Sequence, residues 1–414
     1  MKVEGHILHV DLNNFYASVE CLYNPEIRDK PVIVCGDAEA RHGIVLAKNG
    51  PAKALGVKTD DVIWQAKLKC PGLIAVPADF RKYLRFSRLA KAIYADYTDR
   101  VEAFGVDECW LDITGTEQLF GDGETVANQI RQRFREELGL TASVGVSWNK
   151  IFAKLGSDMK KLDATTVITQ ENFREKVWPL PVRELLYVGR STRTKLQNRA
   201  VLTIGDLANR DIYSLRLLLG VWGETLWHFA NGHDSAPVKF VGEESVVKSV
   251  CNSTTAVRDL QNIEDVKMIV YVLAEGVAAR LRDHGLKCTT VSISVRDKEL
   301  HSFDRQGKLP VPTFLSGDIA NKALELFTAN YRWDRAIRSL GVRGADLVTA
   351  DGHIQLDLFD KDKTQMEGLE SAIDKIRQRF GQYSLQRCTM LFDRKLTGFN
   401  PKDEHVIHPV SYFK

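Results

Sequence analysis

Apolar runs of strand length recur through the first 170 residues of this chain, and segments with helical spacing of apolar residues lie between them. The short runs suit buried strands, whereas the longer periodic segments suit amphipathic helices. The order strand, helix, strand, strand, helix, strand predicts an α+β layer in which helices pack on a sheet. The strands expected are His6–Asp11, Pro31–Cys35, Ile44–Ala47, Leu73–Val76 and Ala142–Val146, and the longer helices are Phe80–Asp99 and Glu124–Leu138.

The pattern changes twice further along the chain. Residues 171–240 hold no convincing strand and are expected to form short helices. Residues 243–350 are expected to form a second, smaller α+β domain. Boundaries near residues 170, 240 and 350 therefore predict an α+β multidomain protein. The elements expected in the second domain are helices at Ile263–Asp283 and Gly317–Phe327 and strands at Cys288–Val295 and Ile337–Val342.

A last helix is expected at Gly368–Phe380, where Leu369, Ile373, Ile376 and Phe380 recur at helical spacing. Amphipathic helices usually turn such a stripe toward a core. We therefore expect this apolar face to dock on the body of the protein.

Composition restricts where such a chain can work. The 57 Lys and Arg nearly balance the 54 Asp and Glu, and a net charge of +3 does not by itself indicate a nucleic-acid partner. No apolar run approaches the ~20 residues that cross a bilayer, and the N-terminus becomes polar too soon for a signal peptide. Seven scattered cysteines form no CxxC pair, which suits a reducing cytoplasm better than a disulfide framework or a zinc site. A cytoplasmic protein without a membrane segment is predicted.

Three carboxylates stand at the ends of predicted strands. Asp11 ends the first strand, and the neighbours Asp107 and Glu108 lie in the turn of a predicted hairpin. Acids beside apolar segments are costly unless they are paired or bind a cation, and three convergent carboxylates suit two Mg²⁺ ions. Asp107 is the natural bridging ligand. Ordinary turn residues are the alternative, because spacing alone does not bring the two clusters together. The motifs GxxxxGK[ST], HExxH and a strand-to-helix GxGxxG are absent from the sequence.

The densest positive segment is residues 183–199, where five basic residues accompany the single acid Glu184. A solvated surface is the simplest interpretation of such a run. Phosphate binding is the other.

Five sequence blocks together resemble the Y-family, or translesion, DNA polymerases. They are HVDLNNFYASVE (9–20), ARHGIVLAKNGPAKALGVKTD (40–60), DFRKYLRFS (79–87), FGVDECWLD (104–112) and ASVGVSWNKIFAKLGSDMKK (142–161). The match covers about residues 1–350. It implies a right-hand polymerase with a palm (1–13 and 77–170), small fingers (14–76), a helical thumb with a helix-hairpin-helix (171–240) and an α+β little finger (243–350). Residues 351–414 form a C-terminal tail.

The resemblance also implies roles for individual residues. Asp11, Asp107 and Glu108 match the catalytic metal ligands, with the backbone of Leu12 near a metal, and two Mg²⁺ ions, replaceable by Mn²⁺, are implied. Tyr16 matches the steric gate, whose ring excludes a 2′-hydroxyl. The residues that match the pocket of the incoming nucleotide are Phe15, Tyr16, Lys53, Tyr83 and Lys161.

Four positions depart from the family pattern. Gly50 stands where tyrosine is frequent, Lys53 where many relatives have arginine, Leu162 where proline is common, and Tyr187 at a glycine of the hairpin signature. The NGPAKALGVK pattern indicates a position closer to the UmuC-like branch than to the DinB branch.

Two surfaces for partners are implied as well. Phosphate contacts are expected at Gly189, Arg190, Arg193 and Lys195 in the thumb and at Lys287 and Arg296 in the little finger. Gln355, Leu356, Asp357, Leu358 and Phe359 resemble the peptide that binds the sliding clamp. Exposed Leu and Phe can anchor in an apolar pocket.

The function expected is template-directed, low-fidelity DNA synthesis across damaged bases, in DNA repair and SOS mutagenesis. Primer-template DNA, deoxynucleoside triphosphates, the clamp and accessory mutagenesis subunits are the expected partners of a monomer that joins the nucleoid when on DNA. A non-catalytic, clamp-bound adaptor and a nucleotide cyclase are the alternatives. The intact carboxylates oppose the first, and the hairpin and clamp peptide oppose the second.

Overall fold

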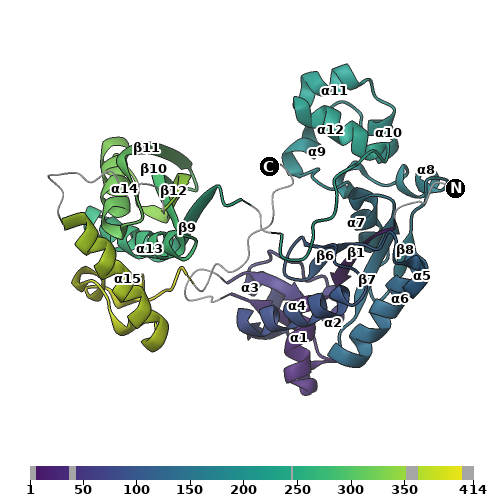
Figure 1. Cartoon of the computed structure of the whole chain (residues 1–414), viewed down its shortest axis with the longest axis horizontal. Coiled ribbons are helices and arrows are strands. Elements are labelled where there is room, and N and C mark those ends of the chain that lie inside the picture. The colour runs from purple at the N-terminus through teal and green to yellow at the C-terminus, as the bar shows by residue number, and fades with distance from the viewer. Residues whose placement is uncertain (1–5, 37–42, 244–245, 351–361, 403–414) are drawn as a thin grey trace. The chain divides into compact units, whose positions relative to one another are not determined.

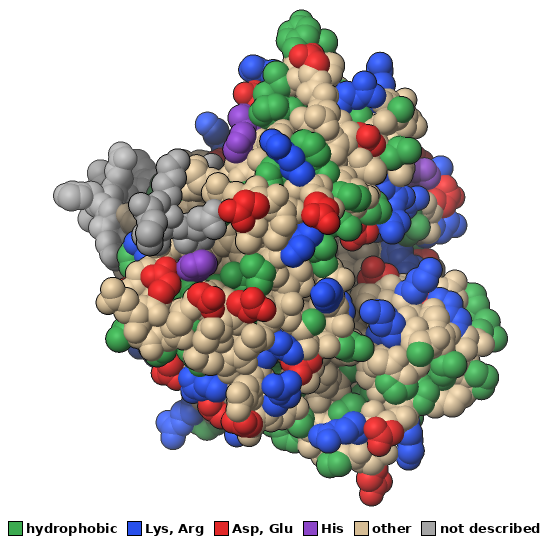
Figure 2. Space-filling model, turned by 90° about the vertical axis from the view of Figure 1, so that its right-hand side faces the viewer, with side chains coloured by type: hydrophobic (Ala, Val, Ile, Leu, Met, Phe, Trp, Pro, Cys, Tyr) green, Lys and Arg blue, Asp and Glu red, His purple; other side chains and the backbone are tan. Residues whose placement is uncertain are grey.

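A computed structural model describes residues 6–36, 43–243, 246–350 and 362–402 (Figure 1). The described residues divide into two compact units, one holding residues 6–36 and 44–243 and the other residues 246–350 and 362–402. Among the described residues, no helix is both long enough and apolar enough to cross a membrane. Charged side chains of both signs are interspersed over the face shown in Figure 2, in keeping with the near balance of the sequence.

A five-stranded sheet of order β5-β6-β1-β7-β8 forms the centre of the first unit. Its middle strand β1 is buried along its whole length and runs antiparallel to both β6 and β7. The five strands are β1 (Ile7–Leu12), β5 (Val101–Ala103), β6 (Glu108–Asp112), β7 (Ala142–Ser147) and β8 (Thr165–Val167).

Helices cover both faces of this sheet. Leu8, Val10 and Leu12 of β1 turn toward one face and join the main core with residues of α1, α4 and α6. Since successive side chains of a strand alternate, His9 and Asp11 turn toward the other face, where α7 lies. The helices are α1 (Phe15–Tyr23), α4 (Phe80–Ala95), α5 (Glu117–Phe120), α6 (Gly123–Arg133) with a π-helical continuation over Phe134–Leu138, and α7 (Lys150–Met159).

Two glycines let α7 approach the sheet closely. A Cβ built on Gly145 of β7 would lie 1.9 Å from the carbonyl oxygen of Ala153 and 2.5 Å from the backbone nitrogen of Ser157. A Cβ on Gly156 would come within 3.1 Å of the Cα of Gly145. Only glycine fits such a contact. The side chains of α7 are thereby carried over the end of β1.

A smaller sheet and a helical segment complete the first unit. The smaller sheet has the order β3-β2-β4, with β3 antiparallel and β4 parallel to β2. Residues 171–243, all of them described, contain helices and no strand. The elements are β2 (Val32–Cys35), β3 (Val45–Lys48), α2 (Gly50–Ala54), α3 (Ile63–Lys69), β4 (Ile74–Pro77), α8 (Phe173–Val177), α9 (Arg190–Gln197), α10 (Ile204–Ala208), α11 (Ile212–Leu219) and α12 (Val221–Ala230).

The second unit is a four-stranded antiparallel sheet of order β11-β10-β12-β9. Its core includes residues of α13 and α14 together with inward-facing residues of the strands. The elements are β9 (Ser249–Leu260), α13 (Ile263–Asp283), β10 (Leu286–Asp297), β11 (Ser302–Thr313), α14 (Ser316–Asn330), β12 (Ile337–Thr349), α15 (Asp362–Phe380) and α16 (Arg394–Thr397).

The helix predicted at Gly368–Phe380 forms as α15 and docks on the second unit, but with the face opposite to expectation. Glu370 is buried and hydrogen-bonds Ser316, and Asp374 pairs with Arg282 of α13 at 2.6 Å. The apolar side chains Leu369, Ile376 and Phe380 are exposed instead. The expectation that the apolar stripe faces the body was therefore wrong, because ion pairs and not apolar contacts hold the helix.

This arrangement predicts unequal effects of neighbouring substitutions. Glu370→Ala removes one partner of a buried ion pair with Arg282 and should lower the free energy of unfolding by about 3 kcal/mol. Leu369→Ser, at a side chain about half exposed, should change it by less than about 0.5 kcal/mol. Denaturant unfolding of both variants measures the difference. Equal losses would place Leu369 in a core.

Candidate active site

Strand pairing brings the three predicted carboxylates together. Asp11 on β1 lies directly opposite Glu108 on β6 in the antiparallel register. Asp107 immediately precedes β6, and its carbonyl oxygen accepts a hydrogen bond from the backbone nitrogen of Leu12 at 3.2 Å. The turn after β1 is tight because Asn14 adopts φ +50°, a conformation that asparagine tolerates better than most residues. Residues far apart in the sequence therefore form one cluster.

Asp107 has the most strongly shifted pKa of the three carboxylates. Burial, reinforced by the negative charges of Asp11 and Glu108, raises its pKa to about 7. Burial also raises the pKa of Asp11, although Lys154 and Lys161 oppose this effect. Both acids are thus held where their negative charge is costly unless a cation is near.

Two lysine ammonium groups supply positive charge in this structure. Lys161 Nζ lies 2.5 Å from Asp11 Oδ2 and 2.9 Å from Asp158 Oδ1. Lys154 Nζ lies 3.1 Å from Glu108 Oε1 and 3.6 Å from Asp11 Oδ2. Sequence analysis singled out Lys161 but not Lys154, which lies on α7 within the block at residues 142–161. The signal for Lys154 was its position one turn before Asp158 on a helix packed against β1.

Glu108 has a different environment from Asp107. Burial by itself would raise its pKa, but a hydrogen bond with His9 and the charge of Lys154 outweigh burial and lower the pKa to about 2. Glu108 thus remains ionised. His9, which is fully buried, has its own pKa lowered, chiefly by burial.

The donor set of this cluster fits a hard divalent cation. The predicted ligands offer only carboxylate and backbone oxygens, which Mg²⁺ prefers. Within the described ranges, no three His, Cys, Asp or Glu side chains are already arranged around one ion position. Instead Lys154 and Lys161 neutralise the carboxylates, and both ammonium groups compete with any ion for the same oxygens.

Stacked aromatic rings line the approach to the cluster. Tyr16 stacks on Tyr83 with ring centroids 4.2 Å apart and planes 14° apart, and Phe80 packs edge-on against both. Burial and the nearby charge of Asp107 raise the pKa of Tyr16 to about 12. Phe15 is buried in the core beneath Tyr16. Tyr16 is thus held rigidly beside the carboxylates.

The structure does not support the predicted triphosphate contact of Tyr83. Its side chain is fully buried, and its hydroxyl donates to Glu20 Oε1 at 2.9 Å and accepts from the backbone nitrogen of Asp79 at 3.2 Å. Both hydrogen bonds tie the phenol to the core. Tyr83 instead supports the ring of Tyr16 from below.

Lys53 is exposed on α2, and a second lysine that sequence analysis missed lies near it. Burial, with repulsion from Lys53 as the next cause, lowers the pKa of Lys48 on β3. At Gly50 a Cβ would meet nothing within 4 Å, so the absence of the usual tyrosine leaves open space beside this pair. Leu162 has φ +75°, which the ring of proline forbids. The loop after Lys161 therefore differs from one built around proline.

Comparison with known proteins identifies the family. Residues 10–158 match the impB/mucB/samB family, and residues 247–358 match the C-terminal domain of that family. A DNA polymerase IV of Acetivibrio thermocellus is 56% identical over 94% of this chain and 98% of its own length. The chain belongs to the Y family of DNA polymerases. The relative named DNA polymerase IV 1 of Bacillus subtilis is 37% identical over 93% of each chain.

A solved structure supports the same fold. The Y-family polymerase chimera of Dbh and Dpo4 has a TM-score of 0.72 and 22% identity, over 83% of this chain and 99% of the chimera. Family membership makes this chain a DNA-directed DNA polymerase of the translesion class. The expected closeness to the UmuC-like branch was wrong, since relatives over the whole chain are DNA polymerase IV proteins.

The basic segment in which the sequence predicts a helix-hairpin-helix includes the turn before α9 and α9 itself. Tyr187, at the position of the missing glycine, has φ +70°, and its ring stacks on Trp222. A bulky residue at positive φ costs of order 1–3 kcal/mol, which packing of the ring offsets. Gly189, the N-cap of α9, is exposed, as are Arg190 and Lys195. Arg193 is partly buried, and its Nε has no hydrogen-bond partner in the described part of the chain.

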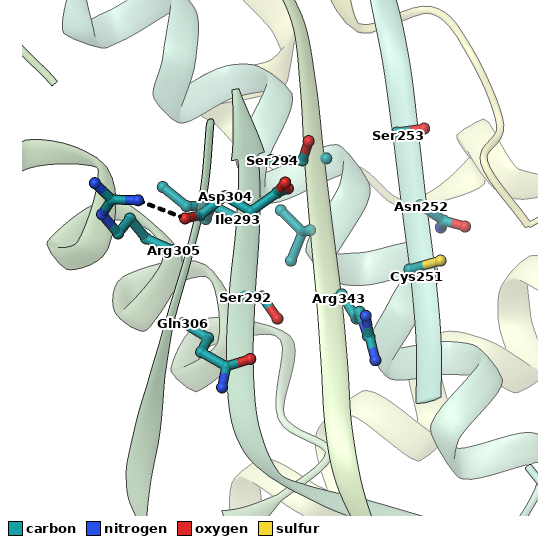
Figure 3. A pocket seen from close by; sticks show the side chains of 12 residues that line it. Cys251, Asn252, Ser253, Ser292, Ile293, Ser294, Asp304, Arg305, Gln306 and Arg343 are labelled. Carbon is teal, nitrogen blue, oxygen red and sulfur yellow. Dashed lines mark hydrogen bonds between the residues drawn. The ribbon is translucent and has the colours of Figure 1, made fainter. Parts of the chain in front are cut away.

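The second unit of the polymerase presents an open sheet face lined with small polar residues. Register places Cys251, Arg343, Ser292 and Gln306 in one row across the four strands. The next row contains Ser253, Gly341, Ser294 and Asp304. Figure 3 shows these side chains around a shallow pocket on the sheet. Sequence analysis missed this surface because Ser and Gly carry no strong individual signal.

Lys287 and Arg296, the two phosphate contacts predicted in the little finger, lie in different environments. Arg296 is exposed on β10. Lys287 points elsewhere: its ammonium pairs with Glu367 of α15 at 2.8 Å, and the side chain is 11% exposed. The structure does not support Lys287 as a phosphate contact, because its charge is used to hold α15.

Proposed function

We propose that this polymerase joins nucleotides by two-metal catalysis at Asp11, Asp107 and Glu108, with Mg²⁺ as the physiological ion and Mn²⁺ able to replace it. The observation that carries this proposal is the half-buried Asp107 close to the charges of two other carboxylates, Asp11 and Glu108. A primer 3′-hydroxyl attacks the α-phosphate of the incoming nucleotide, and pyrophosphate leaves. Divalent ions supply electrostatic stabilisation of the attacking and leaving oxygens when bound.

The protein residues have separate parts in this reaction. The carboxylates and the backbone of Leu12 would hold the ions when these bind, with Asp107 as the ligand shared between them. Lys161 leaves Asp11 and, with Lys53 and Lys48, neutralises the triphosphate. The ring of Tyr16 lies against the sugar of the incoming nucleotide.

Primer extension with purified protein tests the proposed function. Undamaged and lesion-bearing templates should be copied with Mg²⁺ and not with EDTA present. A non-catalytic adaptor or a nucleotide cyclase would give no extended primer under either condition.

We assign the palm, fingers, thumb and little finger of the polymerase to the elements described above. The five-stranded sheet with α4, α6 and α7 is the palm, the sheet β3-β2-β4 with α2 and α3 the fingers, α8–α12 the thumb, and the second unit the little finger. We assign DNA backbone binding to two surfaces: the N-terminal turn of α9 with Gly189, Arg190, Arg193 and Lys195, and the polar sheet face with Arg343 and Arg296. Small Ser and Gly side chains allow the sheet backbone to approach phosphates. Such contacts do not read sequence.

The sheet face gives a quantitative prediction. Arg343→Ala should weaken binding of primer-template DNA and reduce the slope of log affinity against log salt by about 1, because one phosphate contact is lost. Lys287→Ala should leave the slope unchanged and lower stability instead, since its charge pairs with Glu367. Fluorescence anisotropy at several salt concentrations measures both. A changed slope only in the Lys287 variant would contradict the assignment.

The clamp peptide at residues 355–359 lies outside the described residues and stays a prediction. Deleting Gln355 to Phe359 should reduce synthesis stimulated by the sliding clamp about tenfold or more, while synthesis without the clamp stays within about twofold, because removal of apolar anchors costs ≥2 kcal/mol of binding. Primer extension with and without the clamp measures the two rates. Equal losses would indicate a structural role. Accessory mutagenesis subunits and a monomeric state also remain predictions.

A further inference from the structure

Glu20 is a buried acid to which the mechanism proposed above gives no part. It lies on α1 one turn after Tyr16, so the two side chains project from the same face of the helix. The side chain of Glu20 is only 5% exposed, and its carboxylate contacts α4. A buried charge is costly unless it is paired and hydrogen-bonded. The groups that satisfy this carboxylate are in turn held in place by it.

Two consecutive residues of α4 bind the two oxygens of Glu20. Lys82 Nζ lies 2.9 Å from Oε2, and the hydroxyl of Tyr83 lies 2.9 Å from Oε1. The same hydroxyl accepts a hydrogen bond from the backbone nitrogen of Asp79 at 3.2 Å. A carboxylate can only accept, so the single hydroxyl proton of Tyr83 is donated to Glu20. The phenol is thus fixed from two directions, and the bond to the charged carboxylate is the stronger one.

The ring of Tyr83 supports the ring of Tyr16. The two rings stack with centroids 4.2 Å apart and planes 14° apart. Tyr83 therefore contacts α1 at two points one helical turn apart, because its ring meets Tyr16 and its hydroxyl meets Glu20. Phe80 packs edge-on against both rings, at 5.9 Å and 5.8 Å. A shift of Tyr83 away from Glu20 would loosen the surface on which Tyr16 rests.

We propose that Glu20 is a positioning residue for sugar selection, which holds Tyr83 in place and through it the ring of Tyr16. The inference rests on the proposed function, in which this ring lies against the sugar of the incoming nucleotide. A ring that is free to shift gives room to the 2′-hydroxyl of a ribonucleotide, whereas a deoxynucleotide needs no such room. Loss of the Glu20 contact should therefore favour ribonucleotides and leave the incorporation of deoxynucleotides nearly unchanged.

Glu20→Met tests this inference, because it removes both hydrogen bonds and keeps a side chain of similar length. Single-nucleotide incorporation with matched deoxy- and ribonucleoside triphosphates gives kcat/KM for each sugar. We expect the ratio of the two values to fall about three- to tenfold, the contribution of one typical hydrogen bond, while kcat/KM for the deoxynucleotide stays within about twofold.

The ratio separates positioning from folding. A variant that is merely less stable has fewer active molecules, which lowers both rates equally and leaves their ratio unchanged. Glu102→Met is the matched control, because Glu102 is another carboxylate of the first unit, is 11% exposed and pairs with Lys150 at 2.7 Å. It should lower the melting temperature and leave the ratio as in wild type.

Two further substitutions test the route through Tyr83. Tyr83→Phe keeps the ring and removes the hydroxyl, so it should lower the ratio as E20M does. Adding E20M to Y83F should lower the ratio no further, because the contact through which Glu20 acts is already lost. Lys82→Met removes only the ion pair with Oε2 and should leave the ratio unchanged.

Tyr16→Ala in the same assay separates failure of this inference from failure of the proposed function. If Tyr16→Ala keeps the wild-type ratio, the ring does not select the sugar and its proposed role is wrong. If Tyr16→Ala lowers the ratio while E20M and Y83F keep it, only the positioning role of Glu20 is overturned. An equal fall in E20M and in the Glu102→Met control would also overturn it. If E20M does not fold, Y83F decides alone, and a wild-type ratio in Y83F rejects the inference.

Discussion

Replacing Asp107 by asparagine is expected to abolish primer extension and, at the same time, to stabilise the metal-free polymerase. The loss of rate should be at least about 10³-fold, since a metal ion contributes several kcal/mol of transition-state stabilisation and 1.36 kcal/mol corresponds to tenfold. The gain in stability has a separate cause. Two neighbouring carboxylates and burial oppose the negative charge of Asp107, and asparagine carries none.

The sign of the pH dependence follows from the raised pKa. The folded protein binds the proton of Asp107 up to about pH 7, whereas the ordinary value is 3.8. Folding stability therefore falls as the pH rises from about 4 through 7. At about 1.4 kcal/mol per pH unit between the two values, ionised Asp107 costs up to about 4 kcal/mol above pH 7.

Chemical denaturation in EDTA at several pH values measures this cost. D107N should exceed wild type in stability at pH 8, by less at pH 5, and hardly at all near pH 4. Asp112→Asn, at the far end of β6, serves as the control and should show neither effect. A D107N protein less stable than wild type at pH 8 would contradict the electrostatic account of the cluster.

Tyr16→Ala should allow the polymerase to incorporate ribonucleotides. The ring is held beside the carboxylates by its stack on Tyr83, which two hydrogen bonds fix in turn, so it cannot yield to a 2′-hydroxyl. Forcing extra atoms into a packed site costs about 1–3 kcal/mol, so discrimination between deoxy- and ribonucleotides should fall about 10- to 100-fold.

Single-nucleotide incorporation with matched deoxy- and ribonucleoside triphosphates measures this ratio as kcat/KM. Tyr16→Phe is the matched control, because it keeps the ring and its stack and removes only the hydroxyl. The phenylalanine variant should discriminate as wild type does. An unchanged ratio in Tyr16→Ala would reject the gate.

How far the sequence predicts this structure depends on whether the signal is local. Helix α13 was predicted with its observed bounds, because apolar spacing runs through it without a break. The strands β9 and β11 were not predicted. β9 contains Ser and Thr on its exposed face, and β11 is an edge strand that is largely exposed and carries Gly307 and two prolines. Neither has an apolar run.

The active site likewise contains residues that a local sequence signal predicts and residues that it does not. Asp11, Asp107 and Glu108 were predicted from their strand ends and the family pattern, and pairing of β1 with β6 brings them together. Lys154 and His9 were not predicted, because their importance arises from the close approach of α7 to β7 at Gly145, a property of packing. The orientation of α15 was missed for a related reason. Its polar face meets Arg282, Lys287 and Glu275, charges that only the folded second unit presents.

The most direct test of the central claim is a crystal structure of the polymerase with primer-template DNA, an unreactive nucleotide analogue and Mn²⁺, read by anomalous scattering. The account predicts two anomalous peaks bounded by Asp11, Asp107 and Glu108. Asp107 should touch both, and Lys154 and Lys161 should have moved away from these oxygens. Anomalous peaks elsewhere, or a cluster still neutralised by the two lysines with nucleotide bound, would contradict it.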